Sequence, residues 1–97
     1  MNREAFVAAF ADARASAILR TPHEHLAAPA MEAAIDAGFR VVEFTLTIPG
    51  ALDMVRAFSQ RDGLLVSVGT VLTAEDAHAA IDAGASCLVS PVLGTEV

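Results

Sequence analysis

A repeated pentapeptide limits the folds open to this chain. Ala34-Ile35-Asp36-Ala37-Gly38 returns 46 residues later as Ala80-Ile81-Asp82-Ala83-Gly84. Each copy closes a helical pattern with a glycine, which can take the left-handed conformation of a helix C-cap, and each precedes a run of strand-forming residues. One more helix and strand lie between the copies. Units of about 23 residues that alternate strand and helix predict a parallel sheet with right-handed crossovers and helices on both faces.

The rest of the chain fits the pattern α(βα)(βα)(βα)β. Apolar spacing predicts helices over 2–14, 21–38, 49–63 and 73–84 and strands over 16–20, 41–47, 64–68 and 87–90. Thr21, with Pro22 at the first helical position and Glu24 three residues on, predicts a capping box, and Thr73 with Asp76 predicts another N-cap.

The predicted strand 41–47 places a carboxylate inside the sheet. Its two faces alternate between apolar Val42, Phe44 and Leu46 and polar Glu43, Thr45 and Thr47. A charge in such a place must be paired, hydrogen-bonded or neutralised. Two interpretations of Glu43 stay open from the strand alone: proton transfer by a desolvated carboxyl, and an ion pair with an Arg on a neighbouring strand.

Two closures fit four parallel strands, an open doubly wound sheet and a (β/α)8 TIM-type barrel. Polar residues facing inward on strand 41–47 favour the barrel, whose active groups lie at the carboxyl ends of the strands. Four strands are half of such a barrel. We therefore predict one α/β domain over residues 1–97, an N-terminal helix with four parallel strands and three helices, and no second domain.

Composition excludes several classes of function. The 97 residues carry a net charge of −6 with no basic run, which excludes a nucleic-acid footprint. No stretch approaches the roughly 18 apolar residues of a membrane span. The single Cys87 rules out a disulfide framework and fits a reducing cytoplasm. Because side chains two apart on a helix diverge by about 200°, His23-Glu24-His25 predicts no metal site.

Five stretches together resemble the 2-keto-3-deoxy-6-phosphogluconate / 2-keto-4-hydroxyglutarate aldolase family. They are Ala17-Ile18-Leu19-Arg20, the run from Ala37 to Pro49, Val68-Gly69-Thr70-Val71-Leu72, Ala83-Gly84-Ala85 and Val89-Ser90-Pro91. They span essentially the whole chain but only the first half of a family member. The resemblance implies a cofactor-free class I aldolase, usually a homotrimer, that cleaves a 2-keto-3-deoxy sugar acid phosphate into pyruvate and an aldehyde.

The same resemblance implies roles for particular residues. Glu43 takes the position of the proton-transfer carboxylate, which acts on water, the carbinolamine and the enamine carbon. Gly69 and Thr70 take positions that hold the carboxylate and keto group of the pyruvyl unit, and Pro91 lines the same pocket.

Arg20 and Thr47 take positions that face the polar or phosphate end of the substrate; some family members carry Arg in place of Thr47. Class I chemistry needs a Lys to form a Schiff base, and this chain contains none. In the family that Lys lies on a later strand, beyond Val97. The α-amino group of Met1 is the alternative amine, but we do not expect it to substitute for Lys, because it precedes a helix expected at the wrong end of the barrel.

We therefore expect these 97 residues to be inactive alone. The alternative to an aldolase half is a catalytically silent half-barrel. Its bare strand edges would let it self-associate or dock on a partner as a binding module.

Overall fold

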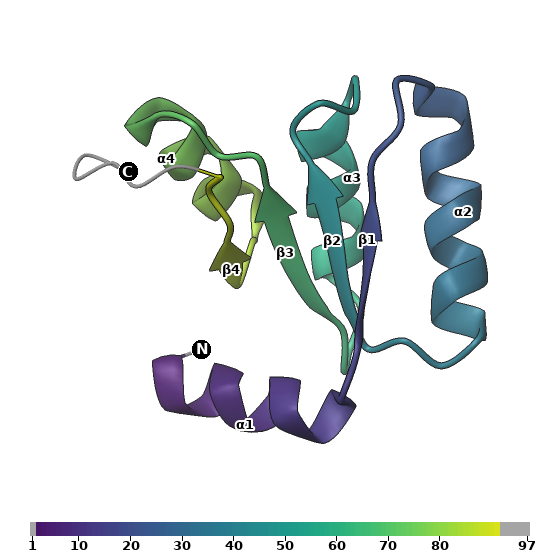
Figure 1. Ribbon diagram of the computed structural model, residues 1–97, viewed down its shortest axis with the longest axis vertical. Helices are drawn as coiled ribbons and strands as arrows, with labels where there is room; N and C mark the ends of the chain where they lie inside the picture. The colour runs from purple at the N-terminus through teal and green to yellow at the C-terminus, as the bar shows by residue number, and fades with distance from the viewer. Residues whose placement is uncertain (1, 92–97) are drawn as a thin grey trace.

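The computed structural model describes residues 2–91, which alternate helix and strand in the predicted order (Figure 1). The elements are α1 (Arg3–Ala13), β1 (Ser16–Leu19), α2 (Glu24–Asp36), β2 (Val41–Thr45), α3 (Ala51–Ser59), β3 (Leu65–Gly69), α4 (Ala74–Ala83) and β4 (Cys87–Leu88). The strands form one sheet in the order β1-β2-β3-β4, and each pairs in parallel with its neighbour. No helix within residues 2–91 is long and apolar enough to cross a membrane.

The strand order decides between the two predicted closures. Each strand lies beside its neighbour in the chain, as in a (β/α)8 barrel, whereas a doubly wound sheet reverses its order at a switch point. In Figure 1, α2, α3 and α4 lie along one side of the sheet, and α1 lies across the amino ends of the strands. The chain therefore folds as an α/β half-barrel. The prediction of helices on both faces is wrong, because crossovers of one hand in an unreversed order place the three crossover helices α2, α3 and α4 on the same face.

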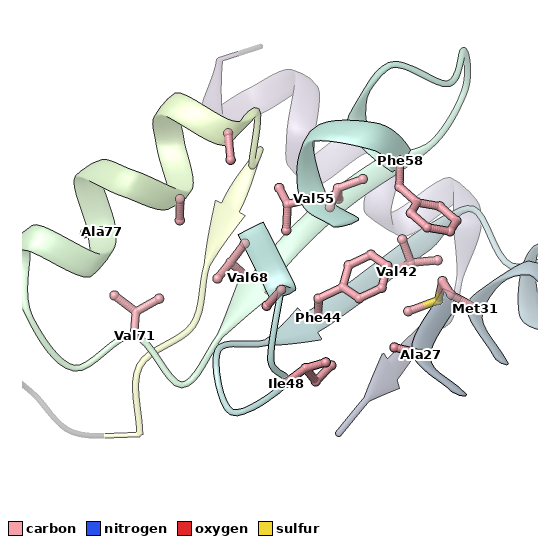
Figure 2. Packing of buried hydrophobic residues seen from close by; sticks show 14 residues of the cluster. Ala27, Met31, Val42, Phe44, Ile48, Val55, Phe58, Val68, Val71 and Ala77 are labelled. Atoms are coloured by element: carbon pink, nitrogen blue, oxygen red, sulfur yellow. The ribbon is translucent and has the colours of Figure 1, made fainter. Parts of the chain in front are cut away.

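The hydrophobic core fills the space between the sheet and the helices α2, α3 and α4 (Figure 2). Phe44 of β2 is fully buried, and the centroid of its ring lies 5.2 Å from that of Phe58 on α3. Burial of a side chain of this size contributes about 1.5–3 kcal/mol. The core consists of Ala27, Met31, Val42, Phe44, Ile48, Ala51, Val55, Phe58, Val66, Val68, Val71, Ala77, Ala80 and Ala83.

Both copies of the pentapeptide end their helices in the predicted way. In each, the glycine N–H donates to the carbonyl three residues back and the next N–H donates to the carbonyl five residues back, at 3.0–3.2 Å. This is the Schellman pattern, which requires a left-handed residue at the glycine position. Gly38 and Gly84 have φ values of 113° and 111°.

One of the two predicted N-caps is confirmed and the other is wrong. The Thr73 hydroxyl accepts from the backbone N–H of Asp76 at 3.0 Å, which caps α4. The Thr21 hydroxyl instead accepts from the N–H of His23 at 3.1 Å. That local bond closes a turn ahead of the helix, so α2 begins only at Glu24.

The element after β2 begins later than predicted. Strand β2 ends at Thr45 because the N–H of Ile48 donates to the Thr45 carbonyl at 3.1 Å and closes a turn. Gly50 has a φ of 76°, outside the helical region, so α3 begins at Ala51 rather than at Pro49.

Other ends also differ from the prediction: β1 ends at Leu19 rather than at residue 20, and β3 covers Leu65–Gly69 rather than 64–68. Helix α3 stops at Ser59 rather than near Gly63, because the N–H of Arg61 turns back to the Phe58 carbonyl at 3.1 Å. Strand β4 covers only Cys87–Leu88 of the predicted 87–90, although the N–H of Val89 still donates to the Val68 carbonyl at 2.8 Å.

Candidate active site

The face of the sheet opposite α2, α3 and α4, here called the inner face, carries the polar residues of β2. Glu43 lies half-buried on it, in register with Ile18 of β1 and Ser67 of β3. Thr45 lies two residues further along the same face, in register with Gly69. The outer face carries Val42 and Phe44 in the core, so the predicted division of this strand into a polar and an apolar face is confirmed for residues 42–45.

The Glu43 carboxyl contacts two residues of β3. The Ser67 hydroxyl donates to Oε1 of Glu43 at 3.3 Å, and Ser67 is only 4% exposed. The carboxyl also lies directly over Gly69, where a Cβ would overlap Oε2 of Glu43 and stand 3.0 Å from its Cδ. The hydrogen bond from Ser67 and the space left by the absent side chain of Gly69 therefore position this carboxyl.

The interpretation of Glu43 as half of an ion pair is wrong for the described residues. The ion pairs within 2–91 join Arg56 to Asp53 and Arg61 to Glu32, all outside the inner face. The Arg20 guanidinium instead donates to the Thr70 hydroxyl at 3.3 Å. Arg20 and Thr70, assigned separately from the sequence, are thus brought together.

Thr70 directly follows β3 and has a φ of 61°. A left-handed conformation costs roughly 1–2 kcal/mol for a residue with a Cβ and is rare for a β-branched one. Such strain persists only where the surroundings impose it and is frequent at binding sites. Thr70 is the one β-branched residue with a positive φ among the described residues, and it lies at a predicted binding position.

Thr47 and Pro91 lie beyond the ends of β2 and β4. Thr47 is exposed, and its hydroxyl oxygen lies 2.7 Å from that of buried Thr45. Pro91 is exposed and is the last residue that the structure describes, two residues beyond the hydrogen-bonded Val89. Substrate contact by either residue stays a prediction, and Met1 lies outside the described residues.

The predicted residues gather at one edge of the sheet. Arg20 follows β1, Thr47 lies two residues beyond β2, and Thr70 follows Gly69, the last residue of β3. Carboxyl ends of parallel strands are where barrel enzymes carry their chemistry. The strand ends offer a guanidinium and hydroxyls for an anionic, oxygen-rich ligand, and Glu43, two residues before the end of β2, adds a carboxyl for proton transfer. A lysine nucleophile is absent, because the 97 residues contain no Lys.

Ser67 is the functional neighbour that the sequence analysis missed. It is the one polar residue in the run Leu64-Leu65-Val66-Ser67-Val68. Alternation along that strand places it on the same face as Gly69, beside Glu43 in the parallel register. The polar interruption of an apolar strand was the available signal.

A cleft of about 520 Å³ opens beside the amino end of α3. Leu46, Ile48, Pro49, Gly50, Ala51, Leu52, Asp53, Arg56 and Asp76 line it. None of the six predicted site residues does, so the cleft adds nothing to the site at the strand ends.

Comparison with protein families shows that the KDPG and KHG aldolase model matches residues 7–97. A curated relative, the 2-dehydro-3-deoxy-phosphogluconate aldolase of Zymomonas mobilis subsp. mobilis, is 37% identical over 71 residues. Those residues are 73% of this chain and 34% of the relative. The chain thus spans about a third of the curated relative that it matches.

Solved structures give the same relationship. The KDPG aldolase of Zymomonas mobilis, solved with 3-phosphoglycerate, matches 98% of this chain and 46% of its own, with a TM-score of 0.81 and 29% identity. The KDPG aldolase of Legionella pneumophila, solved with pyruvate captured as a covalent carbinolamine, matches 92% of this chain and 44% of its own. Its TM-score is 0.74 and its identity 29%.

Proposed function

Because this chain belongs to the KDPG and KHG aldolase family, we propose that it supplies the acid–base half of a Schiff-base aldolase site. Residues 1–97 then form the N-terminal half of the barrel, and Glu43 is the general acid/base. The reaction is the reversible cleavage of a 2-keto-3-deoxy sugar acid, or its phosphate, into pyruvate and an aldehyde.

The position of the Glu43 carboxyl is the observation that supports this proposal most. It is half-buried on the inner face, hydrogen-bonded to Ser67 and without an ion-pair partner among residues 2–91. A cationic partner would hold a carboxyl in its charged form and occupy its oxygens. Without such a partner, the Glu43 carboxyl can exchange a proton with a ligand. Its role is to relay protons between water, the carbinolamine and the enamine carbon.

The residues at the strand ends would bind the anionic parts of the substrate. Gly69 and Thr70 would face the carboxylate and keto group of the pyruvyl unit, with Pro91 against it, and Arg20 and Thr47 would face the distal polar or phosphate end. Pyruvate held in the Legionella pneumophila relative supports a 2-keto acid as the ligand class.

The nucleophilic amine must come from outside these 97 residues, since they contain no Lys. We propose that it comes from a complementary half-barrel that carries the later strands. That segment would close on the inner face and bring its lysine opposite Glu43. A homotrimer and a cytoplasmic setting belong to the same proposal; the free Cys87 is compatible with a reducing compartment.

Complementation tests this function. The chain is co-purified with a segment of the Zymomonas mobilis aldolase, namely the carboxyl-terminal part that lies beyond the region matched by this chain. The mixture is then treated with pyruvate and borohydride. We expect a pyruvyl adduct on the complementary half and turnover of the 2-keto-3-deoxy sugar acid phosphate. The variant E43Q should lose about 10²–10⁴-fold in turnover, the usual contribution of a general acid/base.

The control E75Q changes an exposed glutamate of α4 and should leave turnover unchanged. Full turnover by an assembly with E43Q would contradict the role of Glu43. The chain alone should show no mass increase with pyruvate and borohydride. An adduct on Met1 would give this chain an amine of its own and contradict the need for a second half.

A second candidate is a catalytically silent half-barrel that binds a partner or another copy of itself. The absence of Lys from the chain favours it. A co-purified mixture in which the two halves associate but trap no pyruvate would support this candidate over the aldolase.

A further inference from the structure

The inner face holds a buried hydroxyl to which the proposed reaction assigns no role. Ser67 is 4% exposed and lies in a strand that is otherwise apolar up to Gly69. Burying a hydroxyl costs free energy unless it finds a hydrogen-bond partner, and the partner here is Oε1 of Glu43 at 3.3 Å. A valine at this position would suit the strand better, so the serine requires a reason.

Gly69 contacts the same carboxyl from the next inward position of β3. Its φ is not left-handed, so backbone conformation does not require a glycine there. Space does, because a Cβ on this residue would overlap Oε2 of Glu43. Unlike Gly50, which combines a φ of 76° with a close neighbour, Gly69 is explained by the close approach alone.

The two carboxyl oxygens of Glu43 therefore have different surroundings. Oε1 accepts the Ser67 hydroxyl, whereas Oε2 accepts no hydrogen bond from residues 2–91. No polar side-chain atom in this part of the chain is both fully buried and unpartnered, so Oε2 keeps access to solvent. One oxygen is therefore anchored and the other is open.

We propose that Ser67 and Gly69 form a seat for the Glu43 carboxyl, with Ser67 as a positioning residue that anchors Oε1 and leaves Oε2 to transfer the proton. The inference rests on the proposed aldolase function for its catalytic consequence but not for its geometry. A glutamate side chain has several rotatable bonds, and proton transfer requires the acid to lie within hydrogen-bond distance of the reacting atom. The seat supplies that fixed position from the neighbouring strand.

The geometry is tested on the 97-residue chain by ¹³C NMR of its labelled glutamate carboxyl carbons. E43Q identifies the Glu43 resonance by its loss. At one fixed pH, S67A should shift this resonance, because the anchored oxygen loses its donor, and S67T should return it toward the wild-type position. S59A removes a hydroxyl that bonds backbone carbonyls in the helical layer and should not move it. A Glu43 resonance that is the same in S67A and wild type would overturn the seat.

The catalytic consequence is tested on the assembly with the complementary half, by exchange of the pyruvate methyl protons in D₂O. S67A should lower the exchange rate about tenfold, as expected for one hydrogen bond to a charged group. The amount of borohydride-trapped adduct should stay unchanged, and S67T should restore the exchange rate. An unchanged rate in S67A would overturn the positioning role. If the wild-type assembly exchanges no protons, the aldolase proposal fails, and the NMR comparison alone still decides the seat.

Discussion

Thr70 shows how a single residue holds strain at the edge of the candidate site. Its φ of 61° places a β-branched side chain in a region that favours glycine. The hydrogen bond from Arg20 holds its hydroxyl from across the sheet. One bond of this kind contributes about 1.5–3 kcal/mol when the donor is charged and shielded from water, and less at an exposed residue such as Arg20.

We expect the free energy of unfolding of T70G to exceed that of T70A by about 0.5–1 kcal/mol, because both lose the hydroxyl bonded to Arg20 and only glycine releases the left-handed strain, less the greater entropy of its unfolded state. T70A is the matched control: it loses the same hydroxyl but keeps the Cβ, so it should be less stable than T70G. Urea unfolding of the three proteins measures the differences. T70A as stable as T70G would mean that Thr70 is not strained.

At the residue scale, the sequence placed Glu43 well and its surroundings poorly. Strand alternation alone put this carboxyl on the inner face, away from Val42 and Phe44. The choice between proton transfer and ion pair could not be made, because it depends on where the Arg20 side chain turns. The Arg20 guanidinium donates to Thr70, and the Glu43 carboxyl accepts from Ser67 instead. Which side chain on another strand becomes the hydrogen-bond partner leaves no periodic pattern in the sequence.

The two pentapeptide copies show that one local signal can serve two different packing situations. Gly38 and Gly84 have nearly equal φ and the same hydrogen-bond pattern. A Cβ on Gly38 would meet nothing within 4 Å, whereas one on Gly84 would stand 2.5 Å from the Ser59 hydroxyl oxygen. That hydroxyl donates to the Ala83 carbonyl at 3.3 Å and joins α3 to α4.

We therefore expect G84A to destabilise the chain more than G38A. Both variants carry about 1–2 kcal/mol of left-handed strain, but only G84A also displaces Ser59. Chemical denaturation of each variant and of the double variant S59A/G84A measures the difference. G84A should cost less stability in the S59A background than in the wild type, because the hydroxyl that it would displace is already gone. Equal losses in G38A and G84A would contradict the packing difference.

At the element scale, the order and type of every helix and strand could be read from the sequence, since periodicity and glycine caps agree with each other. The ends were harder to place. Thr21 has the residue type of an N-cap, but its hydroxyl closes a turn with His23. Pro49 suits a first helical position, but the left-handed Gly50 after it delays the helix. In both cases a bond or conformation one or two residues away decides the boundary.

At the scale of the whole molecule, the half-barrel leaves part of its sheet without cover. Among the described strands, β1 and β4 each pair along one side only. Ile18 of β1 is 64% exposed on the inner face, beside Glu43 in the register. Open strand edges next to exposed apolar side chains promote pairing with another chain.

We expect the isolated chain to self-associate through this inner face, and the variant I18T to weaken that association. Threonine keeps the β-branched shape that suits a strand but buries less apolar surface. Because burial of an isoleucine side chain contributes about 1.5–3 kcal/mol, the dissociation constant should rise roughly tenfold or more. I81T is the matched control, because Ile81 is 55% exposed on α4, in the helical layer. Sedimentation velocity over a concentration series measures both. Association weakened by I81T and not by I18T would contradict this prediction. The contact would then lie on the helical layer, and the inner face would be uncovered in the associated chain.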